Sequence, residues 1–281
     1  MLKILLTGSS GQLAGEFISF FQKNGVDFFA PKECDFNIAD KNAVSEIFSY
    51  YKPTHLINCA AYNAVDDAQS FPQKAFAINR DAVETLALEC AKHFAVLVHF
   101  GTDYVFDGVK TDFYLESDAP NPLNVYGQSK LEGEEKAGLA KKSLILRLSW
   151  VIGGGKQNFL YKLSQWAASG SPLKISADEV SVPTFAFDIT RACFKAVKDG
   201  VCGLYHLTNS GYASRYELAK KYCSLKKYKN TIIPVPLSDF TSKAKRPVFS
   251  PMSNALICKT LQISVPHWEE SLEKYCKYHG N

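Results

Sequence analysis

Three residues of this chain have the types and the spacing needed to reduce a carbonyl group. Tyr126 and Lys130 are four residues apart in a segment with a helical pattern, and Thr102 lies near the end of an apolar run typical of a strand. Four residues advance a helix by roughly 6 Å, which places both side chains on one face. A nearby ammonium group stabilises a phenolate, so Tyr126 could pass a proton to a substrate oxygen while Thr102 orients that oxygen. Lys130 could also hold the ribose of a cofactor. A Tyr-x-x-x-Lys pair also arises by chance, as a packed aromatic followed by a solvated lysine.

A glycine-rich turn near the start of the chain predicts a dinucleotide site. The turn follows the apolar run 3–7, of strand length, and precedes residues 16–23, whose apolar positions recur at helical spacing. In such a turn Gly8 permits the tight bend, Gly11 lets the backbone approach the pyrophosphate, and the small Ala14 lets helix pack on strand. The anion would lie at the N-terminus of the helix.

Residues after the second expected strand, 26–30, bear on the choice of cofactor. Asp27 has the offset of an acidic residue that binds the adenosine ribose, but it lies near the start of the strand, so we interpret it as an edge residue. Lys32 follows the strand and could meet a 2′-phosphate, which slightly favours NADPH and leaves NADH open. We expect Asp35 and Phe36 to approach the adenine.

Strand-like runs alternate with helical patterns through the first half of the chain. The runs cover 55–61, 95–106 and 143–151, and the helical patterns cover 41–51, 72–94 and 125–142. This alternation predicts an α/β fold with a doubly wound (Rossmann) parallel sheet. Ligands bind beyond the carboxyl ends of such strands, where residues 58–62, 102–106 and Trp150 fall.

A break in the pattern after Val151 predicts a second, discontinuous lobe. Residues 152–155, Ile-Gly-Gly-Gly, end the expected strand. We predict a dinucleotide-binding domain from residues 1–151 and about 186–207. A smaller substrate-binding lobe would comprise about 152–185 and 208–281, with the proline-rich run 234–251 forming loops over the ligand.

Composition excludes several classes of protein. The net charge of +4 is small for 281 residues and the basic residues are dispersed, which argues against a nucleic-acid partner. The eight cysteines contain no Cys-x-x-Cys pair and the six histidines show no metal-ligand spacing, so we predict no metal site from side chains, with a Mg²⁺ requirement left open. No signal peptide and no membrane span are visible, so we expect a cytoplasmic protein without a membrane partner.

Several motifs together resemble one known family. They are GSSGQLA from residue 8, AAYNAVDDAQ at 60–69, GTDYVFDG at 101–108, PLNVYGQSKLEGE at 122–134, LRLSWV at 146–151, GLYHLTNSG at 203–211 and AKRPVFSPMSN at 244–254. In this order the chain resembles the dTDP-4-dehydrorhamnose reductase family, within the extended short-chain dehydrogenase/reductases. The combination of TDYVFDG with YGxSKxxGE is specific to this family and its near relatives, whereas the glycine turn is not.

The resemblance implies an activity and a role for each matching position. The activity would be NADPH- or NADH-dependent reduction of the C4 keto group of a dTDP-4-dehydro-6-deoxy-hexose, the last step of dTDP-L-rhamnose synthesis. The resemblance also implies a homodimer. The implied catalytic residues are Thr102, Tyr126 and Lys130. The implied cofactor residues are Gly8, Gly11, Gln12 and Leu13 at the pyrophosphate and Ala60, Ala61 and Tyr62 at the nicotinamide. The implied substrate residues are Asp103, Tyr104, Trp150 and Arg246.

The chain departs from the family's usual pattern in the expected substrate lobe and near the cofactor. Residues 178–184, DEVSVPT, stand where D-Q-x-G-x-P-T is usual, Arg215 stands where an aromatic residue is common, and Asn63 stands where threonine is common. Two other functions therefore stay open. One is reduction or epimerisation of a GDP-, UDP- or CDP-linked sugar, which the same fold supports. The other is a non-catalytic, dinucleotide-binding regulatory subunit.

Overall fold

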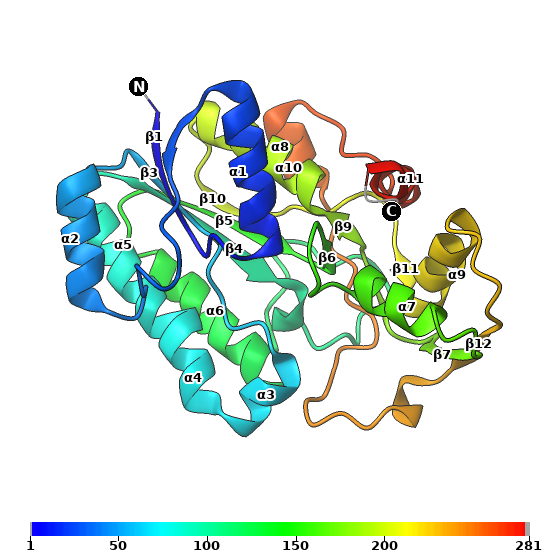
Figure 1. The fold of residues 1–281 in the computed structure, drawn as a ribbon. Coiled ribbons are helices and arrows are strands. Elements are labelled where there is room, and N and C mark those ends of the chain that lie inside the picture. Colours follow the sequence, from blue (N-terminus) through cyan, green and yellow to red (C-terminus); the bar gives the residue numbers. More distant parts are fainter. Residues whose placement is uncertain (1, 279–281) are drawn as a thin grey trace.

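The computed structural model, which describes residues 2–278, contains a parallel sheet of six strands (Figure 1). In spatial order these are β10 (Gly203–His206), β5 (Ser143–Leu148), β4 (Val96–Thr102), β3 (His55–Asn58), β1 (Lys3–Thr7) and β2 (Asp27–Phe29). The chain moves outward from β1 to β2 and then returns to place β3 on the other side of β1. Strand order reverses there, which is where doubly wound sheets bind their ligands. The predicted α/β class with a Rossmann sheet is confirmed.

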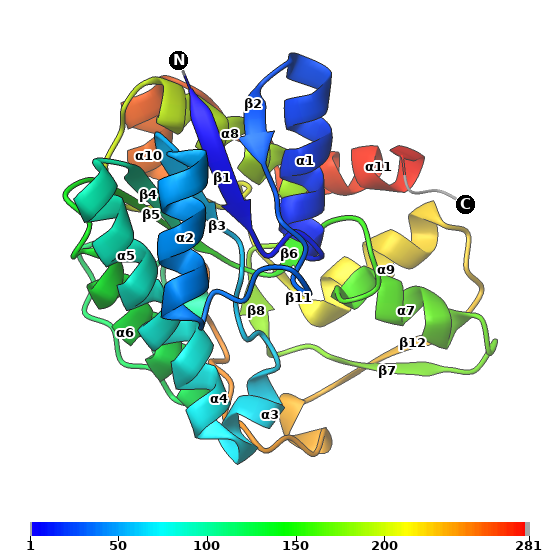
Figure 2. The same ribbon diagram turned by 60° about the vertical axis from the view of Figure 1, so that its left-hand side comes forward.

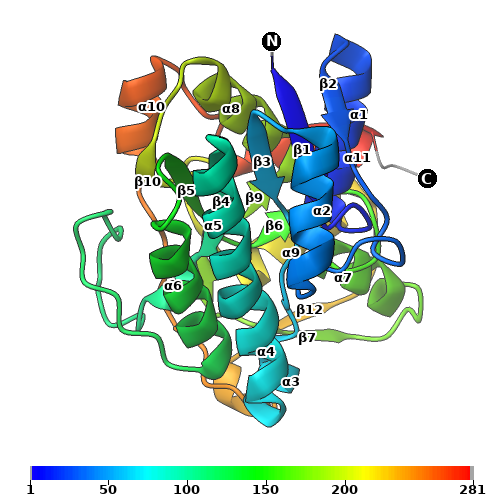
Figure 3. The same cartoon turned by 90° about the vertical axis from the view of Figure 1, so that its left-hand side faces the viewer.

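Helices cover both faces of this sheet (Figures 1 and 3). One face carries α1 (Gln12–Asn24), α8 (Ala186–Lys198) and α10 (Ala255–Leu261), and the other carries α2 (Lys41–Tyr51), α5 (Ala82–His93) and α6 (Val125–Ala137). Successive side chains of a strand point to opposite faces. Ile4 and Leu6 accordingly pack in the first core with Phe17, while Leu5 packs in the second with Val44. Burial on both faces explains why the strands read as unbroken apolar runs.

A third hydrophobic core lies in the other part of the chain. It is formed among α7 (Phe159–Ala167), α9 (Arg215–Leu225) and α11 (Trp268–Tyr278), the helices on the right in Figure 2. Three short strand pairs accompany these helices: β6 (Val151–Ile152) with β9 (Thr184–Phe185), β7 (Leu173–Ser176) with β12 (Ile232–Val235), and β8 (Val180–Ser181) with β11 (Ala213–Ser214). β10 adds to the large sheet and α8 packs on α1, so the chain returns to the first part between about residues 186 and 207. The division into two functional domains stays a prediction.

Several element boundaries differ from the sequence-based expectation. The strand expected over 95–106 ends at Thr102 and continues as a 3₁₀ turn, Asp103–Val105. The helix expected over 72–94 is α4 (Pro72–Phe76), a π turn (Ala77–Asp81) and α5. The loop expected from Pro234 is wrong for its first two residues, because β12 extends to Val235. β12 pairs with β7 alone, and an edge strand tolerates a proline that donates no hydrogen bond.

Two shorter helical elements complete the fold. They are α3 (Val65–Ser70), which follows the loop after β3, and a 3₁₀ turn at Leu237–Asp239. None of the helices in the described part of the chain is long and apolar enough to cross a membrane.

Candidate active site

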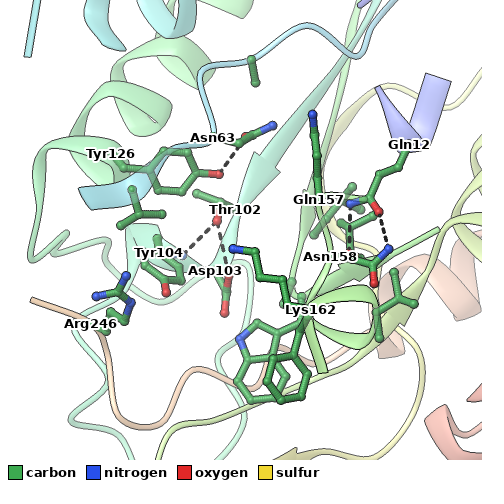
Figure 4. A pocket seen from close by; sticks show the side chains of 18 of the residues that line it. Gln12, Asn63, Thr102, Asp103, Tyr104, Tyr126, Gln157, Asn158, Lys162 and Arg246 are labelled. Carbon is green, nitrogen blue, oxygen red and sulfur yellow. Dashed lines mark hydrogen bonds between the residues drawn. The ribbon is translucent and has the colours of Figure 1, made fainter. Parts of the chain in front are cut away.

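A pocket of about 600 Å³ lies beyond the carboxyl ends of β1, β3, β4 and β5, between the large sheet and the third core. Its lining includes the N-terminus of α1, the loop after β3, the end of β4, the start of α6 and parts of α7 and α9. Figure 4 shows Thr102, Asp103 and Tyr126 gathered on one side of it and Gln12 with Asn158 on the other. The pocket therefore brings together segments that are far apart in the sequence.

The glycine turn lies against the loop that follows β3. Gly8 has a φ of 67°, and a Cβ atom there would lie 2.6 Å from the backbone nitrogen of Ala60. Both observations require glycine, because other residues rarely adopt this conformation and the backbones touch. Gly11 is the N-cap of α1 and donates from its backbone N–H to Gly8 O at 2.9 Å. Ala14 is fully buried against the sheet. The turn has the geometry of a pyrophosphate cradle at a helix N-terminus.

Gln12, the first residue of α1, connects this turn to the loop after β6. Its Nε2 donates to Val151 O at 3.1 Å, and its Oε1 accepts from Gly153 N and from Asn158 Nδ2, both at 3.2 Å (Figure 4). Leu13 and Gln12 both line the pocket. The amide of Gln12 is thus committed to protein partners, and it holds the far wall of the pocket in place.

The residues expected near the adenosine lie in different environments. Ser9 donates to Pro31 O at 2.7 Å, which places the exposed Lys32 just beyond the glycine turn. Asp35 is exposed. Phe36, in contrast, is buried in the second core with Leu5, so its ring supports the sheet and does not line the pocket. The expectation that Phe36 approaches the adenine with its side chain is therefore not what this structure shows.

The three carbonyl-reducing candidates lie together at the end of β4. Thr102 is the last residue of β4, and Tyr126 and Lys130 occupy consecutive turns of α6. Lys130 Nζ donates to Phe100 O at 2.6 Å, and the Tyr126 hydroxyl donates to Asn63 Oδ1 at 3.4 Å. α6 approaches this closely because residue 127 is glycine, where a Cβ atom would overlap the carbonyl oxygen of Tyr104. All three side chains are buried and line the pocket.

Burial shifts the pKa values of both titratable groups in this set. Loss of solvent raises the pKa of Tyr126 to about 12, although hydrogen bonding with Thr102 acts in the opposite direction. Loss of solvent also lowers the pKa of Lys130 to about 8, against the charge of the buried Glu134, which raises it. Tyr126 is therefore a phenol at neutral pH, ready to donate a proton, and Lys130 is mostly cationic.

Asp103 and Tyr104 follow Thr102 in the 3₁₀ turn. Asp103 Oδ2 accepts hydrogen bonds from Ser250 Oγ at 2.7 Å and Ser181 Oγ at 2.8 Å, and burial raises its pKa to about 6. The Tyr104 ring meets the Tyr126 ring edge to face, with centroids 5.6 Å apart. Asp103 thereby joins the end of β4 to two segments of the third core's part of the chain.

Trp150 and Arg246 also line the pocket, each with a protein partner. Trp150 has a φ of 39°, unusual for a bulky residue, and the Arg215 guanidinium carbon lies 3.5 Å from the centroid of its ring. Arg246 forms a two-pronged ion pair with Asp66 of α3, at 2.7 and 3.3 Å, which lowers the pKa of that carboxyl. This pair fastens the loop that contains Arg246 to the first turn of α3.

The loop after β3 carries the three residues expected beside the nicotinamide. Ala60 and Ala61 line the pocket, while Tyr62 packs against Tyr104 and Tyr126. Asn79, from the π turn, accepts from Tyr62 N at 2.8 Å and donates to Tyr62 O at 3.1 Å and to Ser129 Oγ at 2.9 Å. π turns often occur at functional sites.

Sequence reasoning missed several residues that build or line this site. They are Asn79, Gln157, Asn158, Phe159, Lys162 and the 3₁₀-turn neighbour Phe240. No local signal marks Asn79, because the segment 72–94 contains many other polar and charged residues. Nothing local distinguishes Lys162 from the other lysines on helices.

Known proteins resemble this chain along nearly its whole length. A family model described as RmlD substrate binding domain matches residues 2–280. The spore coat polysaccharide biosynthesis protein SpsK of Bacillus subtilis is 35% identical over 98% of this chain and 97% of its own length. The dTDP-4-dehydrorhamnose reductase of Sinorhizobium fredii is 33% identical over 97% of this chain and 96% of its own.

A solved structure is similar along the full length as well. The dTDP-4-dehydrorhamnose reductase of Bacillus anthracis, in complex with NADP, superposes with a TM-score of 0.95 at 29% identity, covering 99% of this chain and 100% of its own. The likeness includes both the large sheet and the part built on the third core.

Proposed function

This chain belongs to the dTDP-4-dehydrorhamnose reductase family, and we propose that it reduces the C4 keto group of a dTDP-4-dehydro-6-deoxy-hexose with NADPH or NADH, as the last step of dTDP-L-rhamnose synthesis. One observation supports the chemistry most directly. Thr102, Tyr126 and Lys130 converge in a single pocket, beside a glycine turn at a helix N-terminus.

The residues present fit a nicotinamide dinucleotide. Gly11, Gln12 and Leu13 line the pocket at the N-terminus of α1, where backbone N–H groups would bind a pyrophosphate. Lys130 would hold the ribose. Lys32, exposed beyond the turn, would meet a 2′-phosphate, which together with the NADP complex of the Bacillus anthracis relative favours NADPH. When bound, the reduced nicotinamide supplies the hydride.

The chain's own residues supply orientation and a proton. Thr102 Oγ1 would hydrogen-bond the substrate carbonyl, and the Tyr126 hydroxyl would protonate the developing alkoxide. A phenol with a pKa of about 12 retains its proton until charge develops on that oxygen. Lys130, buried and mostly cationic at neutral pH, would stabilise the phenolate left behind. Burial strengthens these electrostatic interactions because little water screens them.

The sugar nucleotide would occupy the rest of the pocket. Asp103, Tyr104 and Trp150 would contact the sugar, and Arg246 would lie near the diphosphate with Asp66 fixing its orientation. Residues 1–151 and about 186–207 would bind the dinucleotide, and about 152–185 and 208–281 the substrate. We further propose a cytoplasmic location. We also propose a homodimer, which gel filtration with light scattering would test.

The direct test supplies dTDP-4-keto-6-deoxy-L-mannose with NADPH and follows the absorbance of the reduced nicotinamide. The proposal expects oxidation that depends on the sugar nucleotide and is lost in Tyr126→Phe. Oxidation no faster than in that variant would remove the proposed activity.

A second measurement separates the alternatives. Ligands that bind the native state raise its melting temperature, so thermal shifts with dTDP, GDP, UDP and CDP would rank the nucleotides. A preference for GDP, UDP or CDP would favour a different sugar nucleotide. Cofactor binding with no turnover on any sugar nucleotide, together with a stoichiometric protein partner, would favour a regulatory subunit. The relatives named as dTDP-4-dehydrorhamnose reductases favour the dTDP-linked substrate over both alternatives.

A further inference from the structure

Arg215, the first residue of α9, holds a fixed place in the wall of the pocket. Its guanidinium carbon lies 3.5 Å from the centroid of the Trp150 ring and 5.0 Å from that of Phe159. Its Nη2 lies 3.5 Å from Glu179 Oε1, and its backbone N–H donates to Glu179 O at 3.1 Å. All four residues line the pocket. An arginine stacked on an aromatic ring and paired with a carboxylate has few alternative rotamers.

The elements around Arg215 reinforce this position. Ser214 caps α9 with a reciprocal capping box to Glu217, which sets where the helix begins and hence where Arg215 projects. Trp150 adopts a φ of 39°, a conformation that a bulky residue keeps only where its surroundings enforce it. The side chains of Arg215 and Glu179 are only 19% and 11% exposed, so water screens their charges weakly.

This pair lies beside the residues that follow Thr102. Glu179 directly precedes β8, whose Ser181 donates to Asp103 Oδ2 at 2.8 Å, and β8 pairs with β11, which ends at the residue before Arg215. Asp103 and Tyr104 directly follow Thr102. A sugar whose carbonyl lies at Thr102 and Tyr126 would therefore present its ring hydroxyls toward Arg215 and Glu179.

We propose that Arg215 and Glu179 form a specificity-determining pair that recognises neighbouring hydroxyl groups of an uncharged hexose ring. The inference rests on the proposed function, since it assumes that the carbonyl end of a sugar nucleotide lies at Thr102. Arg215 carries N–H donors and no acceptor, and ionised Glu179 offers acceptors and no donor. A hydroxyl group can satisfy either partner. The pair therefore suits a diol and keeps its own charges balanced without a charged ligand.

The same pair excludes an acidic sugar. A carboxylate on the sugar ring would be attracted by the charge of Arg215, but it would be repelled by the carboxylate of Glu179 at close range in a weakly screened site. Like charges placed together in such a site cost binding free energy, and this repulsion supplies discrimination. Both charges belong to side chains that line the pocket itself, so we assign this discrimination to Arg215 and Glu179.

Binding measurements on the full chain with NADP⁺ test the pair. The probes are dTDP, dTDP-glucose and dTDP-glucuronate, measured by titration calorimetry. We expect Arg215→Met to weaken the binding of dTDP-glucose about tenfold, as for a lost charge-assisted hydrogen bond. The affinity for dTDP should be unchanged. Equal weakening of dTDP and dTDP-glucose would place Arg215 at the diphosphate and overturn the proposal, as would no weakening of either.

The second arm concerns charge. Glu179→Gln should raise the affinity for dTDP-glucuronate, relative to that for dTDP-glucose, by about tenfold or more. Adding Arg215→Met should abolish that gain in affinity. An equal effect of Glu179→Gln on the neutral and acidic sugars would contradict the proposal. Lys221→Met, on the same helix and paired at the surface with Glu269, is the matched control and should change neither ratio.

Turnover separates this inference from the proposed function. If wild-type protein reduces the dTDP-4-keto sugar, Arg215→Met should raise KM more than it lowers kcat, because the pair binds the sugar away from the transferred proton. A wild-type protein that shows no turnover would remove the proposed function, whereas active wild type with unchanged KM in Arg215→Met would remove only the specificity pair. Melting temperatures of all variants within a few degrees of wild type exclude misfolding as the cause.

Discussion

The hydroxyl of Tyr126 donates a hydrogen bond to Oδ1 of Asn63 at 3.4 Å. The contact is at the long end of the range for hydrogen bonds, so a substrate oxygen can replace Asn63 at little cost. Asn63 belongs to the loop after β3, which Asn79 fixes to the π turn. The proton donor of the site is thus held by a weak contact to a well-anchored loop until a better acceptor arrives.

Replacing Tyr126 with phenylalanine should abolish most of the activity while sparing ligand binding. Removing a general acid costs about 10²- to 10⁴-fold in rate, so kcat for sugar-dependent NADPH oxidation should fall in that range, with Kd for dTDP unchanged. Tyr222→Phe, at a buried tyrosine of the third core, is the control. A Tyr126→Phe enzyme with wild-type kcat would show that the proton comes from elsewhere.

Replacing Gly8 with alanine should impair cofactor binding through contact between backbones. Gly8 and Gly25 have nearly the same φ, 67° and 62°, but a Cβ atom on Gly25 meets nothing within 4 Å, whereas one on Gly8 meets Ala60. The left-handed backbone should cost each alanine variant about 1 kcal/mol of stability, and the clash with the Ala60 backbone should destabilise Gly8→Ala further. Gly8→Ala alone should weaken NADPH binding, measured by fluorescence titration. Equal affinities in the two variants would contradict the close-approach argument.

Breaking the ion pair beneath Lys130 should destabilise the fold strongly. Arg147 and Glu134 pair at 2.8 Å with side chains 3% and 5% exposed. Removing one partner of such a pair leaves a buried charge and typically costs about 3–5 kcal/mol, so Glu134→Ala should lower the free energy of unfolding in urea by about that amount. Glu84→Ala removes a pair of similar length to Lys136 whose side chains are both 37% exposed, and it should cost under about 1 kcal/mol. Similar losses in both variants would mean that burial does not govern these pairs.

Asp103 should make the protein less stable as pH rises from about 4 to about 6. Its pKa is raised from 3.8 to about 6 by burial, so in this window the unfolded chain has released the proton that the folded chain still binds. Stability falls with pH wherever the folded state binds more protons. Asp103→Asn cannot ionise, so its free energy of unfolding relative to wild type should improve across this window, by on the order of 3 kcal/mol. Urea unfolding at a series of pH values measures this, and a difference independent of pH would contradict it.

Local sequence pattern was sufficient to predict the framework of the site. Runs such as 55–61 are apolar because their strands are buried on both faces. This pattern is local to each strand, so it can be recognised without knowing how the rest of the chain folds. The helix α2 was predicted at its observed bounds, Lys41–Tyr51. The motifs also identified the reductase family correctly. The spacing of Tyr126 and Lys130 depends only on helix geometry, so it too could be read directly.

What the sequence could not determine are contacts between residues distant along the chain. Phe36 is buried in the same core cluster as Leu5, and Arg246 pairs with Asp66 of α3, 180 residues away in the sequence. Arg215 and Glu179 are 36 residues apart in the sequence, and only the structure shows that they pair while Arg215 stacks on Trp150. Periodicity and motif spacing record what a residue's own element requires. Which charges face each other, and what they exclude from the pocket, is decided when the elements pack.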